Sequence, residues 1–129
     1  MTTTEPITAT SADKVGEVWG NAFNRGDMEG MIAQYADDAV LVLDPAQPIH
    51  GTTGIREALQ GFLALKGTVT FEAPEVAEYG DIALVHARWR MTGSGPEGPV
   101  EMGGYTSEVV RRGPDGTWKY VIDDPGMGR

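Results

Sequence analysis

The sequence contains no cysteine, so neither disulfide bonds nor thiolate chemistry can contribute to its function. Basic residues are also scarce: 10 Lys and Arg stand against 19 Asp and Glu, which gives a net charge of −9. This charge argues against binding to nucleic acids and to anionic membrane surfaces, both of which attract clusters of Lys and Arg. No apolar run approaches the roughly 20 residues that a membrane-spanning helix needs.

Residues 1–9, MTTTEPITA, lack the basic start and the apolar run of a signal peptide, so we expect a cytoplasmic protein. The length of 129 residues is close to the commonest domain size, and 40% hydrophobic residues are enough for a core. We expect a single domain over residues 10–124. A flexible N-terminus (1–9) would precede it, and a short C-terminal tail (125–129) would follow.

The first part of the chain has helical periodicity. Apolar residues recur at helical spacing from Ala12 to Phe23, and Gly26 is the kind of residue that ends a helix. Asp27 predicts the cap of a second, short helix. A third helix is predicted after the segment 51–54, and it would end near Gly67.

The remaining segments have the patterns of strands. Asp37-Asp38 predicts a turn, and the uninterrupted apolar run 39–43 is typical of a strand buried on both faces. From Thr68 onward the period changes to 2. This predicts further strands at 68–79 (interrupted by Pro74), 82–92, 100–112 and 117–123. Helices followed by consecutive strands indicate an α+β fold with an antiparallel sheet, and a curved sheet over helices would leave a cavity for a small molecule.

Short motifs spread along the chain resemble those of a known superfamily. They are Asn24-Arg25-Gly26-Asp27, Tyr35-Ala36-Asp37-Asp38-Ala39, Asp44-Pro45, the segment 51–57, Gly80-Asp81 with Ala83, and the segment 115–119. In this order they resemble the nuclear transport factor 2-like superfamily, near its ketosteroid isomerase and SnoaL-like polyketide cyclase branches. They are also similar to the association domain of calmodulin-dependent kinase II. The resemblance implies a cone-shaped α+β barrel, with three N-terminal helices packed in the concavity of a strongly curved, mostly antiparallel sheet.

The resemblance implies Asp44 as a catalytic base. In ketosteroid isomerases a general-base Asp precedes a proline at this strand end, as Asp44 precedes Pro45 here, although one extra residue separates Asp38 from Asp44. A carboxylate beside an apolar pocket gains basicity through desolvation, as carbon-acid chemistry near neutral pH requires. The alternative is that Asp44 caps the turn before Pro45 and faces water.

Two further residues correspond to the hydrogen-bond donors of those isomerases. Trp19 takes the place of a tyrosine on the first helix, and an indole N–H donates a hydrogen bond but is a far weaker acid than a phenol. Glu108 takes the place of a carboxylic acid on the strand before the last turn. Glu108 is either a buried, protonated acid or a surface residue in a salt bridge, depending on which face of its strand it occupies.

The strand 82–92 can be oriented in two ways. One face carries His86, Arg88 and Arg90, and the other carries Val85, Ala87, Trp89 and Met91. We expect the face with Arg90 to line the cavity, where Arg90 could pair with Glu108 across neighbouring strands or bind a ligand carboxylate. The alternative is that this face is solvated and that Trp89 packs on the helices.

The remaining candidates are ligand-binding side chains. His50 is expected near the mouth of the pocket, and the aromatic lining is expected to come from Phe23, Tyr35, Phe62 and Tyr105, although core packing is the commoner role of such residues. We expect no metal site, because nothing in the spacing of His50, His86 and Asp44 supports one. The segment 93–98 matches G-x-G-x-x-G but lies between strands, so we expect no nucleotide and no other cofactor.

Three classes of function remain open. The first is an isomerase, cyclase or dehydratase that uses Asp44 as base and Trp19 or Glu108 as donor on a hydrophobic ligand. The second is a non-catalytic binding module, with Arg90 as its polar anchor, and the third is an association domain. The relatives pair through the outer face of the sheet, so we expect a homodimer, for which Val85, Trp89 and Met91 would be suitable if their face points outward.

Overall fold

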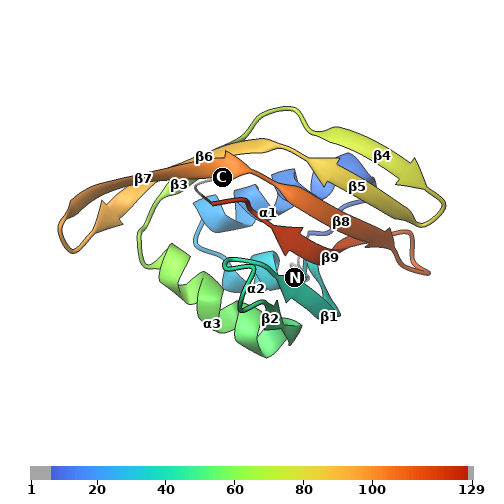
Figure 1. Ribbon diagram of the computed structural model, residues 1–129, viewed down its shortest axis with the longest axis horizontal. Helices are drawn as coiled ribbons and strands as arrows, with labels where there is room; N and C mark the ends of the chain where they lie inside the picture. Colours follow the sequence, from blue (N-terminus) through green and yellow to red (C-terminus); the bar gives the residue numbers. More distant parts are fainter. Residues whose placement is uncertain (1–6, 128–129) are drawn as a thin grey trace, which may run out of the picture.

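The computed structural model describes residues 7–127, and it forms a curved sheet that arches over a group of helices (Figure 1). A single 3-10 turn, Ala12–Lys14, leads directly into the first helix. The helices are α1 (Val15–Asn24), α2 (Met28–Ile32) and α3 (Gly51–Leu63). The strands are β1 (Tyr35–Leu41), β2 (Ile49–His50), β3 (Thr68–Phe71), β4 (Glu75–Tyr79), β5 (Ile82–His86), β6 (Arg88–Gly95), β7 (Gly98–Tyr105), β8 (Ser107–Arg112) and β9 (Trp118–Asp124).

The strands form two sheets, which confirms the predicted α+β fold with a mostly antiparallel sheet. Six strands pair in the order β2-β1-β9-β8-β5-β4, and three pair in the order β3-β6-β7. Among these pairs only β1 and β9 run parallel. Within the described residues, no helix has the length and apolar character needed to span a membrane.

The two long strands that we predicted at 82–92 and 100–112 each bend where they pass from one sheet to the other. The breaks fall at Ala87 and Thr106, which face one another: the Thr106 N–H donates to the Ala87 carbonyl at 2.8 Å, and the Ala87 N–H donates to the Thr106 hydroxyl at 2.9 Å. Because the threonine side chain replaces a backbone partner here, the ladder changes direction without leaving the Ala87 N–H unpaired. This bend helps to create the concave face that covers α1.

The predicted boundary between α1 and α2 is confirmed. Gly26 has a φ of +72°, which glycine adopts without strain, and the Asp27 carboxylate accepts a hydrogen bond from the Gly30 N–H at 2.9 Å. The turn predicted at Asp37-Asp38 is wrong, because both residues lie inside β1. A register shift in the pairing of β1 with β9 between Tyr35 and Val40 accommodates these two exposed acidic residues.

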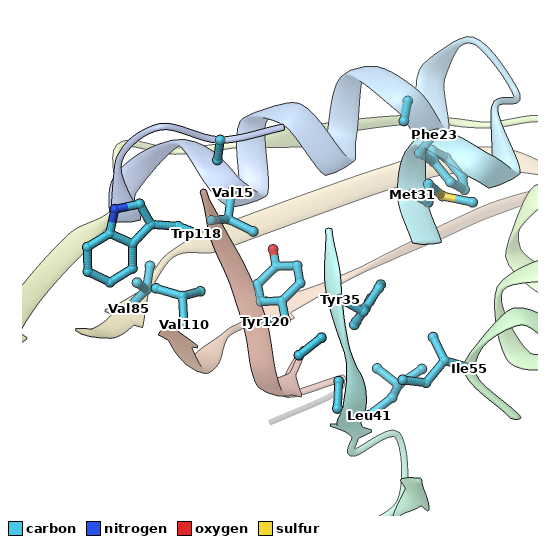
Figure 2. Packing of buried hydrophobic residues seen from close by; sticks show 14 of the residues in the cluster. Val15, Phe23, Met31, Tyr35, Leu41, Ile55, Val85, Val110, Trp118 and Tyr120 are labelled. Carbon is cyan, nitrogen blue, oxygen red and sulfur yellow. The ribbon is translucent and has the colours of Figure 1, made fainter. Parts of the chain in front are cut away.

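The core fills the space between the helices and the concave face of the sheet. Figure 2 shows Val15 and Phe23 approaching from α1, while Tyr35 and Tyr120 project from the neighbouring strands β1 and β9. The segments expected to flank the domain take part in this packing. Ala9 is buried and bridges to Trp118, and Met127 bridges to Gly104. The rest of the predicted flexible N-terminus, up to residue 6, and residues 128–129 of the predicted tail lie outside the described residues.

Candidate active site

A cavity lies between the helices and the concave face of the sheet. Its lining comes from both sheets, from α1 and α3, and from the C-terminal segment: Trp19, Tyr35, Leu41, Leu43, Leu59, Phe62, Val69, Phe71, Trp89, Met91, Thr106, Glu108, Tyr120, Asp123, Pro125 and Met127. The cavity volume is about 50 Å³, on a scale on which one water needs roughly 10–15 Å³. The cavity volume therefore corresponds to a few water molecules. Since each water takes about 30 Å³ in the liquid, a few waters occupy about as much space as a compact ring.

Two carboxyl groups stand side by side in this apolar cavity. Glu108 on β8 and Asp123 on β9 are register partners on neighbouring antiparallel strands. Their residues are only 4% and 7% exposed. The Tyr35 hydroxyl donates a hydrogen bond to Asp123 Oδ2 at 2.7 Å, and the Tyr35 ring lies 5.1 Å from that of Tyr120.

The surroundings favour one shared proton in this pair. Burial, and next the nearby Asp123 charge, raise the pKa of Glu108 well above its ordinary value, while the hydroxyls of Thr106 and Tyr120 act in the opposite direction. Burial also raises the pKa of Asp123, but hydrogen bonds from Tyr35 and from protonated Glu108 counteract it. Asp123 is therefore the carboxyl that ionises first, and Glu108 is the one that keeps its proton.

The cavity is lined by acidic side chains but by no cationic one among the described residues. Among residues 7–127, no Lys, Arg or His side chain lines it. The charge on Asp123 is therefore balanced by neutral donors alone, namely the Tyr35 hydroxyl and the Glu108 carboxyl. A buried carboxylate without a cation retains the basicity that desolvation confers.

Trp19 contributes a hydrogen-bond donor. Its ring stacks on Phe23, with centroids 5.6 Å apart, and meets Phe71 edge to face at 6.3 Å. These contacts hold the indole beside the cavity, where its buried Nε1 atom makes no hydrogen bond of normal geometry within the described part of the chain. The indole N–H does act on the nearby Tyr35 hydroxyl, where it opposes the rise that burial causes in the pKa of Tyr35. A buried N–H without a partner costs free energy, and an acceptor atom on a ligand would satisfy it.

The family of the chain follows from a sequence comparison. The sequence profile of the SnoaL-like domain matches residues 17–122, which is most of the protein. The chain belongs to the SnoaL-like domain family. No curated protein matches this sequence.

Several solved structures share the fold of this SnoaL-like protein. A ketosteroid isomerase-like protein from Erwinia carotovora atroseptica has a TM-score of 0.77 at 20% identity, covering 89% of this chain and 92% of its own. A scytalone dehydratase-like protein from Novosphingobium aromaticivorans has a TM-score of 0.79 at 12% identity, with coverages of 90% and 80%. A calmodulin-dependent protein kinase II association domain-like protein from Xanthomonas campestris has a TM-score of 0.76 at 17% identity, with coverages of 98% and 97%. At these identities the likeness shows the fold alone.

The structure places Asp44 outside the cavity. Leu41 and Leu43 line it, but Asp44 is not among the lining residues. Asp44 is exposed, and its Oδ1 accepts a hydrogen bond from the Ala46 N–H at 2.9 Å. This is the turn-capping role that we considered as the alternative for Asp44. His50 is also exposed and stands at the start of α3, away from the cavity lining.

The expected orientation of the strand 82–92 is wrong, because its inward face carries Val85, Ala87, Trp89 and Met91. Arg90 is exposed and lies 3.6 Å from Glu101, so the expected Arg90–Glu108 pair does not form. Alternation along β6 explains both results, since the large apolar face is the one that the helices can bury. Because this face points inward, the condition under which Val85, Trp89 and Met91 could form a dimer interface is not met.

The other outward residues of this strand make surface contacts. The Arg88 guanidinium donates to the Tyr105 hydroxyl at 2.9 Å and lies 4.7 Å from the centre of that ring. Tyr105 therefore does not line this cavity; with Arg88 and Arg90 it lines an open groove on the outer face of β6 and β7 instead. His86, whose Nδ1 lies 2.9 Å from the Thr106 carbonyl oxygen, does not line the cavity either.

Five predicted residues are now placed at or behind the cavity wall. Trp19, Tyr35, Phe62 and Glu108 line it, while Phe23 is buried and supports Trp19 from behind. Asp123, Tyr120 and the C-terminal residues Pro125 and Met127 were missed by sequence reasoning. The pair Asp123-Asp124 before Pro125 was the available signal for an acidic residue at the end of a buried strand.

Proposed function

We propose that this SnoaL-like protein catalyses proton transfer on a small, hydrophobic carbonyl compound without a cofactor, as an isomerase, cyclase or dehydratase does. The observation that carries the proposal is the buried Glu108–Asp123 pair in an apolar cavity. Two adjacent carboxyls with different environments supply an acid and a base at the same pH. Ketosteroid isomerases apply the same principle, since a carboxyl that stays protonated in an apolar site serves them as a hydrogen-bond donor.

Asp123 is the proposed base. Its carboxylate is desolvated and is held by the Tyr35 hydroxyl, so its position and ionisation are both controlled. In an isomerisation it would take a proton from the carbon next to a carbonyl and return that proton two carbons further along the resulting dienolate. The negative charge that develops on the carbonyl oxygen needs hydrogen-bond donors in a water-poor site.

Trp19 is the proposed donor to that oxygen, and the single O–H of Glu108, which holds the Asp123 carboxylate before the reaction, is proposed to turn to the same oxygen once Asp123 has taken the proton. The Trp19 Nε1–H makes no hydrogen bond of normal geometry among the described residues, and Glu108 keeps its proton because burial raises its pKa. With one base and two neutral donors, the site can stabilise an enolate without a metal ion or an arginine. This proposal transfers the role of base from Asp44 to Asp123.

The test is the conversion of 3-cyclohexenone to 2-cyclohexenone, a ring of a size that the cavity can hold, followed by ultraviolet absorbance. We expect the parent protein to accelerate this conversion above the rate in buffer. The Asp44→Asn variant should match the parent, because Asp44 lies in an exposed turn. Loss of activity in Asp44→Asn with full activity in Asp123→Asn would return the base to Asp44. Saturable binding of the ring without conversion would favour a non-catalytic binding module.

We also propose that the protein forms a homodimer, now through the outer face of the six-stranded sheet. Register partners place an apolar row across five strands on this face: Ala77, Leu84, Val109, Ile122 and Val40. Leu84 and Ile122 remain 44% and 41% exposed. The next row along the same face carries Arg111 and Lys119, which would moderate the repulsion between two chains of charge −9.

A charge in the middle of this row should separate the dimer. For Leu84→Glu we expect the mass measured by light scattering to fall from twice the 13.8 kDa chain mass to the chain mass itself, because a carboxylate buried in an apolar interface has no partner. Glu101→Gln, on the outer face of the other sheet, is the control and should remain dimeric. A parent protein that is monomeric at micromolar concentration would contradict the proposal.

A further inference from the structure

The C-terminal segment Pro125–Met127 forms part of the cavity wall. Pro125 and Met127 both line the cavity, and the segment begins two residues after the acid Asp123. It follows β9 and crosses to the C-terminal end of β7, where Met127 bridges to Gly104 (Figure 1). The part of the cavity wall that directly follows Asp123 in the sequence is therefore formed by residues of the predicted tail 125–129, which we expected to lie outside the domain.

Three hydrogen-bonded contacts hold this segment in place. The Trp89 indole N–H donates to the Pro125 carbonyl at 2.7 Å. The Gly126 N–H donates to Asp124 Oδ1 at 2.9 Å, and Met127 forms an isolated bridge with Gly104. Trp89 also lines the cavity, so the side chain that anchors the segment belongs to the same wall.

The segment can lie this close to β7 because both facing residues are glycines. A Cβ atom on Gly104 would lie only 2.2 Å from the Gly126 carbonyl oxygen, and one on Gly126 would meet the Tyr105 carbonyl oxygen. Gly126 also has a φ of +60°, a conformation that favours glycine. Side chains larger than hydrogen at either position would lift the segment and move Met127 away from the cavity.

We infer that Met127 is a specificity-determining residue, which sets the largest ligand that can reach Asp123. A methionine side chain has three rotatable bonds and adapts to irregular space, so it can change rotamer to accommodate a compact ring. A larger ring needs the space that the side chain itself occupies. The small volume of the cavity, about 50 Å³, agrees with this role. The inference rests on the proposed function only in assigning a substrate to the cavity; the size limit applies to any ligand there.

The test compares two flat phenols that differ by one ring, phenol and 2-naphthol, bound to the full chain. Binding can be followed by tryptophan fluorescence, since Trp19 and Trp89 both line the cavity. For Met127→Ala we expect the ratio of 2-naphthol affinity to phenol affinity to rise about tenfold, because the shortened wall admits the second ring. Met127→Leu should stay close to the parent ratio.

Met102→Ala is the matched control. It removes the same side chain from β7, where Met102 packs against the core without lining the cavity. An equal change of the ratio in Met102→Ala, an unchanged ratio in Met127→Ala, or no binding of either phenol to any variant would overturn the inference. A raised ratio in Met127→Ala together with full turnover in Asp123→Asn would leave the inference standing and remove the proposed base.

Discussion

Asp123→Asn is expected to slow the isomerisation of 3-cyclohexenone by about 100- to 10,000-fold, the usual contribution of a positioned general base. Asparagine has almost the same shape and can still accept the hydrogen bond that the Tyr35 hydroxyl donates to Asp123 Oδ2. It cannot accept a proton from carbon near neutral pH. The change therefore removes the base while the neighbouring contacts are kept, and initial rates at several substrate concentrations would measure it.

The controls for this result separate chemistry from folding. Urea unfolding of Asp123→Asn should show a cooperative transition, and phenol should still bind, because the apolar lining and Trp19 are unchanged. Asp44→Asn serves as the matched acid-to-amide change at an exposed turn. A loss of turnover in Asp123→Asn smaller than about threefold would be below what a general base contributes, and it would refute the assignment of Asp123.

Glu108→Gln is expected to change how the stability of the protein depends on pH. Burial and the Asp123 charge raise the pKa of Glu108 well above its ordinary value of 4.5, so the folded state holds this proton more tightly than the unfolded state does. The stability that this proton contributes is fully present below the ordinary pKa and is lost as the pH rises toward the folded pKa. Over that interval the loss approaches about 1.4 kcal/mol for each pH unit.

Glutamine carries a permanent N–H donor and does not ionise, so this loss should disappear in Glu108→Gln. Relative to the parent, the variant should become progressively more stable as the pH rises from 4.5 toward the folded pKa of Glu108, as measured by urea unfolding at a series of pH values. The exposed Glu101→Gln change is the control, because Glu101 lies on the outer face of β7 and no buried acid is removed. Parallel stability curves for the parent and Glu108→Gln would mean that Glu108 titrates as an ordinary exposed acid.

The order of the elements and the fold class could be predicted because the signals for them are local. Helical periodicity ended at Gly26, and Asp27 capped the next helix as its side chain and spacing indicated. The strands predicted at 100–112 and 117–123 pair antiparallel, and the Gly-Pro-Asp-Gly composition of residues 113–116 between them is typical of a tight turn. The motifs that resemble the nuclear transport factor 2-like superfamily also depend on such local segments, and the match to the SnoaL-like domain supports them.

Which acids meet in the cavity could not be predicted in this way. Near the hairpin turn Arg112 pairs with Trp118, and continuing that register would place Ile122 opposite Glu108. A register shift between Val109 and Val110 instead places Asp123 there. One extra residue reverses the face of every side chain beyond it, so a bulge that has no clear sequence signal converts Asp123 from an outward residue into a cavity acid.

The same reasoning explains the error on β6 and the importance of the C-terminal segment. Arg90 and Trp89 alternate on one strand, and their sequence is compatible with either orientation until the helices are in place to bury the apolar face. The cavity role of Met127 depends on its bridge to Gly104, a residue far away along the chain. Composition and periodicity were thus sufficient for the α+β architecture, and the resemblance was sufficient for Glu108 and Trp19 as candidates, because both depend on local segments. The identity of the base and the wall that limits the ligand depended on strand register and long-range contacts, which no local pattern encodes.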